Sequence, residues 1–385
     1  MKKVVTLTGI ILTLFVLGLT SVSSDPPDFH ASDISIDEST VRAGIDAIDE
    51  SRAMLRTLVE EEDIVGLAIA VSYEDSLIWS AGFGYSDLDQ QSPISPEQTY
   101  FRIASLSKPI TATVMGRLVE DGIIDLDNSV YDYVPDFPKK KHDFTLRHLA
   151  AHRSGIRHYK RFEKENRAPL SLEEGLRKFQ RSKLEFEPGT AYLYSSYGYN
   201  LLGVAMQNAA QQSFDDLLSE YVTVPLGMGH TIPDDADYAD LRTSGFFDFN
   251  WRNKLRVAKP VNMYMKLPSG GMLSTAEDLV RFGNAYAYQR ILDASTQNEI
   301  LADVPLPNGD QVGYGLGWGL GTDRAGRSII SHSGGNTGSA CRLIVYPEEK
   351  FTVAVVSNTF GIDWIKFMRT VNSVSAMILD EAEQQ

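Results

Sequence analysis

The chain has 385 residues, of which 43% are hydrophobic and 23% are charged, so it is long enough to bury a sizeable globular core. Its formal net charge of −15 argues against nucleic acid or an anionic lipid surface as a partner, because both require a basic face. The single cysteine, Cys341, excludes an internal disulfide and a cysteine-rich zinc site.

The N-terminus has the pattern of a secretory signal. A short basic start precedes an apolar run from Val4 to about Leu19, and small residues follow it. We predict a signal peptide over residues 1–24, a polar linker over 25–38, and a periplasmic or secreted mature protein. The alternative is an uncleaved anchor, because the run almost spans a bilayer. No later run reaches the about 18 apolar residues of a membrane span, so no stable membrane insertion is expected after cleavage.

Further along the chain, predicted strands lie near both ends and predicted helices lie between them. Apolar spacing predicts helices over 39–62, 105–121, 145–152, 171–182, 198–219 and 363–383. Strands are predicted over 65–72, 76–83, 340–346 and 351–357, the last two as a hairpin. We therefore expect an α+β fold in one catalytic domain, 39–385. In it, an antiparallel sheet is flanked by terminal helices, and a mostly helical subdomain is inserted over about 109–265.

The segment with the clearest catalytic pattern is Phe101-Arg-Ile-Ala-Ser-Leu-Ser-Lys108. Ser105 and Lys108 are three residues apart at the start of a predicted helix, where residues i and i+3 share a face. The free N–H groups of a helix N-terminus suit a developing oxyanion. A desolvated lysine loses its proton near neutral pH and then serves as a general base. For this pattern alone, a capping serine followed by a solvated lysine is the simpler interpretation.

Two later segments change that interpretation. Tyr194-Ser-Ser-Tyr-Gly-Tyr-Asn-Leu-Leu-Gly203 and His332-Ser-Gly-Gly335 follow the Ser-x-x-Lys pattern in this order. Together the three motifs resemble the serine β-lactamase and penicillin-binding-protein-like superfamily. The resemblance is strongest to its class C β-lactamase-related branch. That branch includes esterases, D-amino-acid peptidases, D-alanyl-D-alanine carboxypeptidases and mitochondrial serine β-lactamase-like proteins.

The resemblance extends from about residue 50 to the end of the chain. Several other stretches are similar to the same family, namely 121–135, 145–156, 225–228, 268–279 and 314–318. Several ordered motifs over such a length are far more specific than any single motif.

The resemblance implies roles for individual residues. Ser105 is expected to be the nucleophile, and Lys108 and Tyr194 a coupled pair that takes or relays its proton. The tyrosine pKa of about 10 makes it a poor base unless nearby cations lower it. His332 stands where many relatives have lysine, and we expect its charge to titrate near pH ~6.5. The backbone N–H groups of Ser105 and Gly335 are the expected oxyanion hole. The expected substrate-binding residues are Ser196, Ser333 and Gly334.

One position departs from the family pattern. The second motif is usually Tyr-x-Asn, but this chain has Tyr194-Ser195-Ser196 and no Tyr-x-Asn anywhere. In relatives the asparagine holds the amide side chain of the substrate, and a serine makes fewer hydrogen bonds. The change leaves Ser105, Lys108 and Tyr194 in place, so we retain catalysis and rank β-lactam hydrolysis lower.

Three other features are given structural interpretations. His148 and His152 have metal-ligand spacing with His158 nearby, but the glutamate of the zinc-protease pattern is missing, so we expect His152 to support a loop. The alternating glycines over 313–321 lack the signals of a phosphate loop; Gly313–Trp318 is predicted to be a strand with close backbone approach. Trp318 is assigned to the core or the cleft, and Cys341 to the core.

The sequence thus predicts an exported serine hydrolase that cleaves an amide or ester through an acyl-enzyme, without metal or organic cofactor. Peptidase or esterase action ranks first, D,D-carboxypeptidase action second and β-lactamase action third. The alternative is a penicillin-binding-like module that binds peptides or self-assembles with little turnover. The expected partner is a small-molecule or peptide substrate, and the oligomeric state stays open.

Overall fold

The computed structural model describes residues 35–384 with gaps at 89–90, 161–162, 164–168 and 236–242. The predicted signal peptide and residues 25–34 of the predicted linker lie outside the described residues. Within the described ranges, no helix combines the length and apolar character needed to cross a bilayer.

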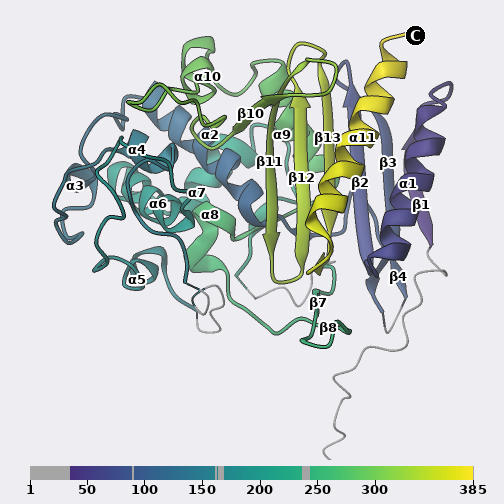
Figure 1. The fold of residues 1–385 in the computed structure, drawn as a ribbon, viewed down its shortest axis with the longest axis horizontal. Helices are drawn as coiled ribbons and strands as arrows, with labels where there is room; N and C mark the ends of the chain where they lie inside the picture. Colours follow the sequence, from purple (N-terminus) through teal and green to yellow (C-terminus); the bar gives the residue numbers. More distant parts are fainter. Residues whose placement is uncertain (1–34, 89–90, 161–162, 164–168, 236–242, 385) are drawn as a thin grey trace, which may run out of the picture.

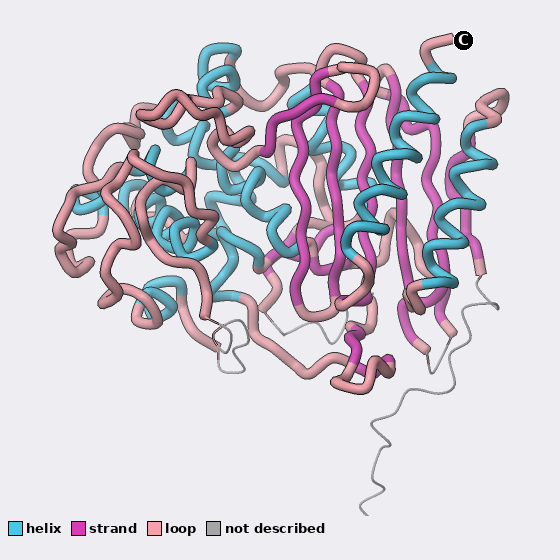
Figure 2. The backbone as a smooth tube through the Cα atoms, in the orientation of Figure 1, coloured by secondary structure: helices cyan, strands magenta, loops and turns pink. Residues whose placement is uncertain are grey.

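An antiparallel sheet forms one half of the molecule (Figures 1 and 2). Its central pair joins the two ends of the chain, because β2 (Gly66–Tyr73) pairs with β13 (Phe351–Ser357), with Ala70 opposite Ala354. This confirms the predicted sheet built from both termini. The full order is β1 (Ile36–Val41), β3 (Ser76–Asp87), β2, β13, β12 (Ser339–Tyr346), β11 (Ser328–Asn336) and β10 (Gly319–Thr322), with β4 (Ser92–Pro93) paired to β3.

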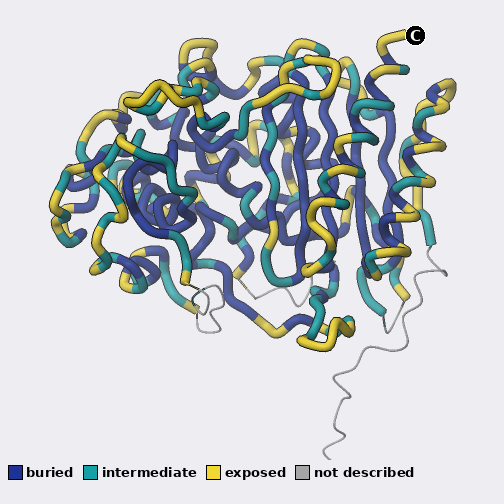
Figure 3. Tube along the Cα trace, in the orientation of Figure 1, coloured by how far each residue is buried: buried dark blue, intermediate teal, exposed yellow. Residues whose placement is uncertain are grey.

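The alternation of side chains along the central strands decides what packs on each face of this sheet. Ile69 and Val355 point into the cluster under α1 (Ala47–Glu61) and α11 (Trp364–Ala382). Ala68 and Ala354 point the other way, towards α9 (Ala276–Ala287), where small side chains allow close approach. The two terminal helices therefore cover one face, as predicted, and expose their outer sides (Figure 3).

The start of the domain corrects two predicted boundaries. Residues 36–38 belong to strand β1 and not to a linker, because this segment pairs with β3 from Ile36 opposite Phe83. The helix expected over 39–62 begins only at Ala47. Apolar Val41, which the spacing assigns to the helix, lies in β1 and is 45% exposed.

The other half of the molecule is mostly helical and surrounds α2 (Ser107–Glu120), whose residues are buried on nearly every side. The helix expected over 198–219 is two helices, because Gln211 adopts a left-handed conformation and Ser213 caps a new helix. Two helices after residue 265 also pack on α2, so the helical half exceeds the predicted 109–265. Its other helices are α3 (Val130–Tyr133), α4 (Leu146–Ala150), α5 (Leu172–Leu176), α6 (Ser196–Ala210), α7 (Phe214–Leu218), α8 (Leu267–Gly270) and α10 (Ala294–Ile300).

The glycine-rich stretch before β10 is a looped segment, and the predicted strand over 313–318 is wrong. Gly317 has φ +95°, and a side chain there would meet Ala112 and the carbonyl of Lys108, so the expected close backbone approach is present. Trp318 is fully buried and stacks on Phe282, which assigns it to the core. Cys341 is also buried, as expected.

Two small sheets connect the halves. One contains β5 (Phe101–Arg102), β9 (Met272–Ser274) and β6 (Ile232–Pro233), and the other contains β14 (Thr359–Phe360), β7 (Phe247–Phe249) and β8 (Leu255–Val257). The first of these places Arg102, and therefore the chain entering Ser105, against the segment before α9.

Candidate active site

A pocket lies where the helical half meets the sheet. It contains Ser105, Tyr194, Ser196 and Gly335, four of the residues expected to be functional. The remaining lining residues are Ala104, His158, Tyr159, Met263, Lys266, Ser269, Gly270, Asn336, Thr337 and Phe360. A wider groove between β10–β12 and α11 contains none of the expected residues.

The Ser105–Lys108 pair is in contact. Ala104 takes a left-handed conformation, φ +45°, and starts a short 3₁₀ turn over Ala104–Leu106 before α2 begins at Ser107. The predicted helix therefore starts two residues later than expected, but the Lys108 Nζ still lies 3.1 Å from the Ser105 Oγ. The turn brings the serine to the pocket wall at the beginning of the helix.

Lys108 is fully buried and surrounded by oxygen atoms. Its Nζ also lies 3.1 Å from the Ser196 Oγ and 2.6 Å from the carbonyl oxygen of Ser269. Burial lowers the pKa of Lys108 well below its usual value, because the amine loses its hydration and no carboxylate of the described residues pairs with it. The neutral amine, which can accept a proton, is thereby favoured.

Two histidines hold the Tyr194-Ser195-Ser196 segment. The backbone N–H of Ser195 donates to His152 Nδ1, and that of Ser196 donates to His158 Nδ1, each at 3.1 Å. The Ser195 hydroxyl then caps α6 by accepting from the N–H of Gly198. His152 thus supports the motif segment, as predicted. His148 Nδ1 accepts from the N–H of Thr145 within a helix cap, so all three rings serve backbone groups.

The electrostatics of Tyr194 differ from expectation. Burial raises the pKa of its phenol above the usual range, although a hydrogen bond with Ser105 opposes the shift. The expected cations do not lower this pKa, since burial favours the neutral forms of both Lys108 and His332. Tyr194 is therefore a neutral hydroxyl whose ring centroid lies 4.8 Å from the Lys108 Nζ.

His332 is also corrected. Burial, with help from Lys108, lowers the pKa of His332 to about 3, so the expected titration near neutral pH does not occur. Its Nδ1 lies 2.8 Å from the carbonyl oxygen of Ser333 and donates to it, so the neutral ring accepts at Nε2 from the Tyr314 hydroxyl, 3.1 Å away. The ring centroid of His332 is 6.2 Å from that of Tyr194.

We expect this histidine to make the fold acid-sensitive. Its folded pKa lies below the unfolded value of about 6.5, so its contribution to stability is complete above pH ~6.5 and is lost as the pH falls towards 3. Urea unfolding of wild type and His332→Gln between pH 7 and 4 measures this effect. The wild type should lose more stability than the variant over this range, and parallel curves would contradict the assignment.

The strand that carries His332 places its neighbours differently from the prediction. The Ser333 side chain points away from the pocket, where its Oγ accepts from Arg342 Nη1 at 2.9 Å and lies near Met368 of α11. Gly334 packs behind the nucleophile: a side chain there would lie 2.9 Å from the nitrogen of Ser105 and 2.4 Å from the carbonyl oxygen of Ile103. Of the third-motif residues assigned to substrate contact or the oxyanion hole, only Gly335 lines the pocket.

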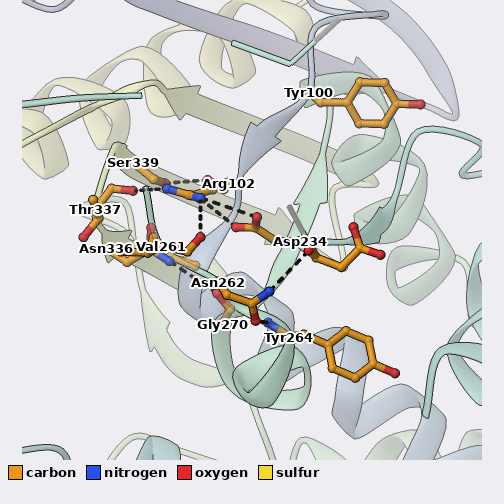
Figure 4. Close-up of polar contacts among 12 residues, drawn as sticks. Tyr100, Arg102, Asp234, Val261, Asn262, Tyr264, Gly270, Asn336, Thr337 and Ser339 are labelled. Carbon is orange, nitrogen blue, oxygen red and sulfur yellow. Dashed lines mark hydrogen bonds and ion pairs between the residues drawn. The ribbon is translucent and has the colours of Figure 1, made fainter. Parts of the chain in front are cut away.

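A buried ion pair holds the far rim of the pocket (Figure 4). Arg102 Nε lies 2.6 Å from the Asp234 carboxylate, and both side chains are almost completely buried. The same guanidinium donates to the carbonyl oxygens of Thr337 and Val261. Asn336, next in the chain to Gly335, donates to the carbonyl of Gly270 at 3.3 Å. Arg102 therefore connects the turn after β11 to the helical half through these contacts.

Some pocket residues could not be predicted from the sequence. Ser269 was part of a family-like stretch, but nothing marked its carbonyl as a partner of Lys108. Tyr159 and Lys266 come from segments without periodicity or motif, and the Lys266 Nζ lies 4.8 Å from the Tyr159 ring centroid. Only the folded chain brings these residues to Ser105.

Comparison with known proteins identifies the family of this chain. The family model described as Beta-lactamase matches residues 52–370, so the chain belongs to the beta-lactamase family, within the serine beta-lactamase and penicillin-binding-protein-like superfamily. The mitochondrial serine beta-lactamase-like protein LACTB of Homo sapiens is 29% identical, covering 80% of this chain and 74% of that protein. Penicillin-binding protein 4* of Bacillus subtilis is 27% identical, covering 80% and 71%.

Solved structures share the fold. The octameric penicillin-binding protein homologue from Pyrococcus abyssi has a TM-score of 0.75 at 22% identity, covering 86% of this chain and 77% of that one. The D-amino acid amidase from Ochrobactrum anthropi SV3 has a TM-score of 0.73 at 23% identity, covering 88% and 98%. The chain therefore has the fold and family of a serine hydrolase.

Proposed function

We propose that this protein is an exported serine hydrolase that cleaves an amide or ester through an acyl-enzyme on Ser105. The observation that carries the proposal is the contact of the buried Lys108 amine with the Oγ of Ser105, a residue that lines the pocket. The low pKa of Lys108 supports its role as the base, since a protonated amine cannot take the serine proton.

The first half-reaction follows from this arrangement. The Ser105 Oγ attacks the substrate carbonyl carbon while its proton passes to the Lys108 Nζ. The carbonyl oxygen becomes an oxyanion, which the backbone N–H groups of Ser105 and Gly335 stabilise; one such donor is typically worth about 3 kcal/mol. When the carbon–leaving group bond breaks, the departing nitrogen or oxygen receives the proton through the neutral Tyr194 hydroxyl.

The second half-reaction releases the acyl group. Water attacks the ester carbon of the acyl-enzyme, its proton moves to the same Lys108–Tyr194 pair, and the Ser105 Oγ leaves and is reprotonated. His332 takes no proton in either step, because its neutral ring is fixed by Tyr314 and the carbonyl of Ser333.

Ser196 supports a ranking of substrates. Its hydroxyl is occupied by Lys108 at 3.1 Å, and the family asparagine that holds an amide side chain is absent. We therefore rank simple esters and peptide or amino-acid amides above penicillins. The amidase named among the similar structures gives D-amino-acid amides a place in the substrate panel.

Turnover of p-nitrophenyl acetate, D-phenylalanine amide and a penicillin, each with wild type and Ser105→Ala, tests the proposal. Intact mass after each incubation reports any adduct. We expect hydrolysis by the wild type alone, with an acyl adduct on the wild type if deacylation is slow. Equal signals from both proteins would overturn the enzyme assignment and favour a binding module.

Export is part of the proposal and rests on the N-terminal pattern of the sequence. N-terminal sequencing of the protein expressed with its full leader tests it. A mature chain that begins near residue 25 is expected, whereas an intact Met1 in a membrane fraction would indicate an anchor.

A further inference from the structure

The β7–β8 hairpin carries a charge opposite to that of the whole chain. Residues 249–260 contain four cationic side chains and no aspartate or glutamate, although the chain has a net charge of −15. One of the four, Arg256, pairs with Asp248 at 2.5 Å. The other three are exposed, and none of them is in an ion pair with another described residue. They are Arg252, Lys254 and Lys259.

A tryptophan lies at the tip of this hairpin. Trp251 is 86% exposed, although an indole is among the side chains that gain most from burial. The turn that carries it is ordered, since the Asn250 Oδ1 accepts from the backbone N–H groups of Arg252 and Lys254 at 2.8 and 3.1 Å. The Arg252 guanidinium lies 4.5 Å from the indole ring. The turn therefore presents an apolar group and cations to solvent together.

Other exposed apolar side chains lie on the segments next to this hairpin. Nine large apolar side chains are exposed in the described part of the chain, and five of them belong to the hairpin, to β14 or to the start of α11. These five are Trp251, Val257, Phe360, Trp364 and Ile365. We call these five side chains and the three exposed cations the hairpin surface. Such a concentration of exposed apolar side chains is typical of an interaction site.

The hairpin surface adjoins the pocket. β14 pairs with β7, with Phe360 opposite Asp248, and Phe360 also lines the pocket. A Cβ atom on Gly335 would lie 3.5 Å from the rings of both Phe360 and Trp364. The hairpin lies beyond the end of the sheet, near the start of α11, and is largely exposed (Figures 1 and 3). Apolar surface thus continues from the pocket wall towards the hairpin.

The carboxylates at the start of α11 already have partners. Asp363 caps the helix, where its Oδ1 accepts from the backbone N–H groups of Ile365 and Lys366. Glu62 lies 2.8 Å from the Lys366 Nζ. These acidic groups are therefore engaged within their own segments.

Cations beside exposed aromatic and aliphatic side chains fit the surface of an anionic bilayer. There, lysine and arginine meet lipid phosphates, and an indole lies at the boundary between headgroups and acyl chains. A hydrated polyanion offers the cations a partner but offers Trp251 no apolar environment. The total charge does not prevent this contact, because salt screens distant exposed carboxylates beyond about 8–10 Å.

We propose that the hairpin surface docks this protein onto an anionic lipid bilayer, with Trp251 in the headgroup region and the three exposed cations against lipid phosphates. Docking holds the pocket close to the bilayer, because Phe360 belongs to both. The inference goes beyond the proposed function and does not depend on chemistry at Ser105.

Co-flotation with vesicles tests the proposal. The vesicles contain phosphatidylglycerol and phosphatidylcholine in equal amounts, and vesicles of phosphatidylcholine alone serve for comparison. The protein is the mature chain from residue 25, which contains every described element, because an apolar leader would bind vesicles by itself. Arg252→Gln/Lys254→Gln is compared with Lys139→Gln/Lys141→Gln, a matched control that removes the same charge from two exposed lysines of the helical half.

We expect the wild type to float with the anionic vesicles and not with the neutral ones. Loss of the two hairpin cations should weaken binding by about 25-fold, because each cation near an anionic surface contributes about fivefold. The control pair should bind as the wild type does. Trp251→Ala should weaken binding by about tenfold through lost apolar burial. Ser105→Ala should bind fully, so the result is separate from that of the activity assay.

Tryptophan fluorescence gives a second measurement. Trp79 and Trp318 are buried, so Trp364→Phe leaves Trp251 as the one exposed tryptophan of the chain. Its emission should shift to shorter wavelength when anionic vesicles are added. An unshifted emission, or equal loss of binding in the two charge-removal pairs, would overturn the proposal.

Two further outcomes would replace the bilayer with another partner. Binding to soluble polyglutamate that equals vesicle binding and survives Trp251→Ala would indicate a polyanion site. An oligomer that forms without vesicles and dissociates in Trp251→Ala, together with no vesicle binding, would assign the hairpin surface to a contact between copies of the chain. Either result would overturn the proposal.

Discussion

Lys108→Ala should lower the rate of Ser105 acylation by about 10²–10⁴-fold, the range typical of a lost general base. The amine lies 3.1 Å from the nucleophile, and His332 is a poor replacement because burial lowers its pKa to about 3. Stopped-flow release of p-nitrophenol measures acylation directly. The wild-type rate should rise with pH and level off well below pH 10.5, because burial lowers the Lys108 pKa.

Two controls separate this role from a structural one. The variant should unfold near the wild-type temperature, because losing a buried amine also removes its desolvation cost. A small primary amine added to Lys108→Ala should restore part of the rate by occupying the vacated space. A near-normal rate in Lys108→Ala without added amine would refute the assignment.

Arg102→Met should cost about 3–5 kcal/mol of unfolding free energy, the usual cost of breaking a buried ion pair by removing one partner. The change leaves the buried Asp234 carboxylate without its guanidinium and frees the carbonyl oxygens of Thr337 and Val261. Urea unfolding measures the loss. Turnover should also fall, since the turn beside Gly335 loses its anchor.

A double-mutant cycle tests the ion pair itself. Arg102→Met/Asp234→Leu should be less destabilised than the sum of the single variants, because neither charge remains buried. Additive losses would mean that Arg102 acts through the backbone carbonyls and not through the carboxylate.

The sequence predicted the parts of the site that depend on local spacing. Ser105 and Lys108 meet because a three-residue separation at a helix start places them together, and the 3₁₀ turn at Ala104 does not change this. The antiparallel sheet was also predictable, since strands such as 351–357 are continuous apolar runs. These features are properties of short segments.

The predictions that failed concern properties that depend on the surroundings of a residue in the folded protein. The predicted titration of His332 near neutral pH was wrong, because burial lowers its pKa and burial is a property of the whole fold. No sequence pattern marked Tyr159 as a pocket residue, because a tyrosine in a loop reaches Ser269 only after two distant segments have folded together. The Ser333 assignment could have been avoided: if His332 points into the site, the alternation of a strand directs Ser333 to the opposite face.

The pairing of β2 with β13 also sets an order of events during synthesis. At the ribosome, Ala70 emerges long before its partner Ala354, so the centre of the sheet cannot close until β13 has been made. Until then the apolar faces of β2 and β3 lack their cover from α11. The nascent protein therefore exposes strand edges until β13 has been made, and a truncation before Phe351 removes a central strand together with the helix that covers it.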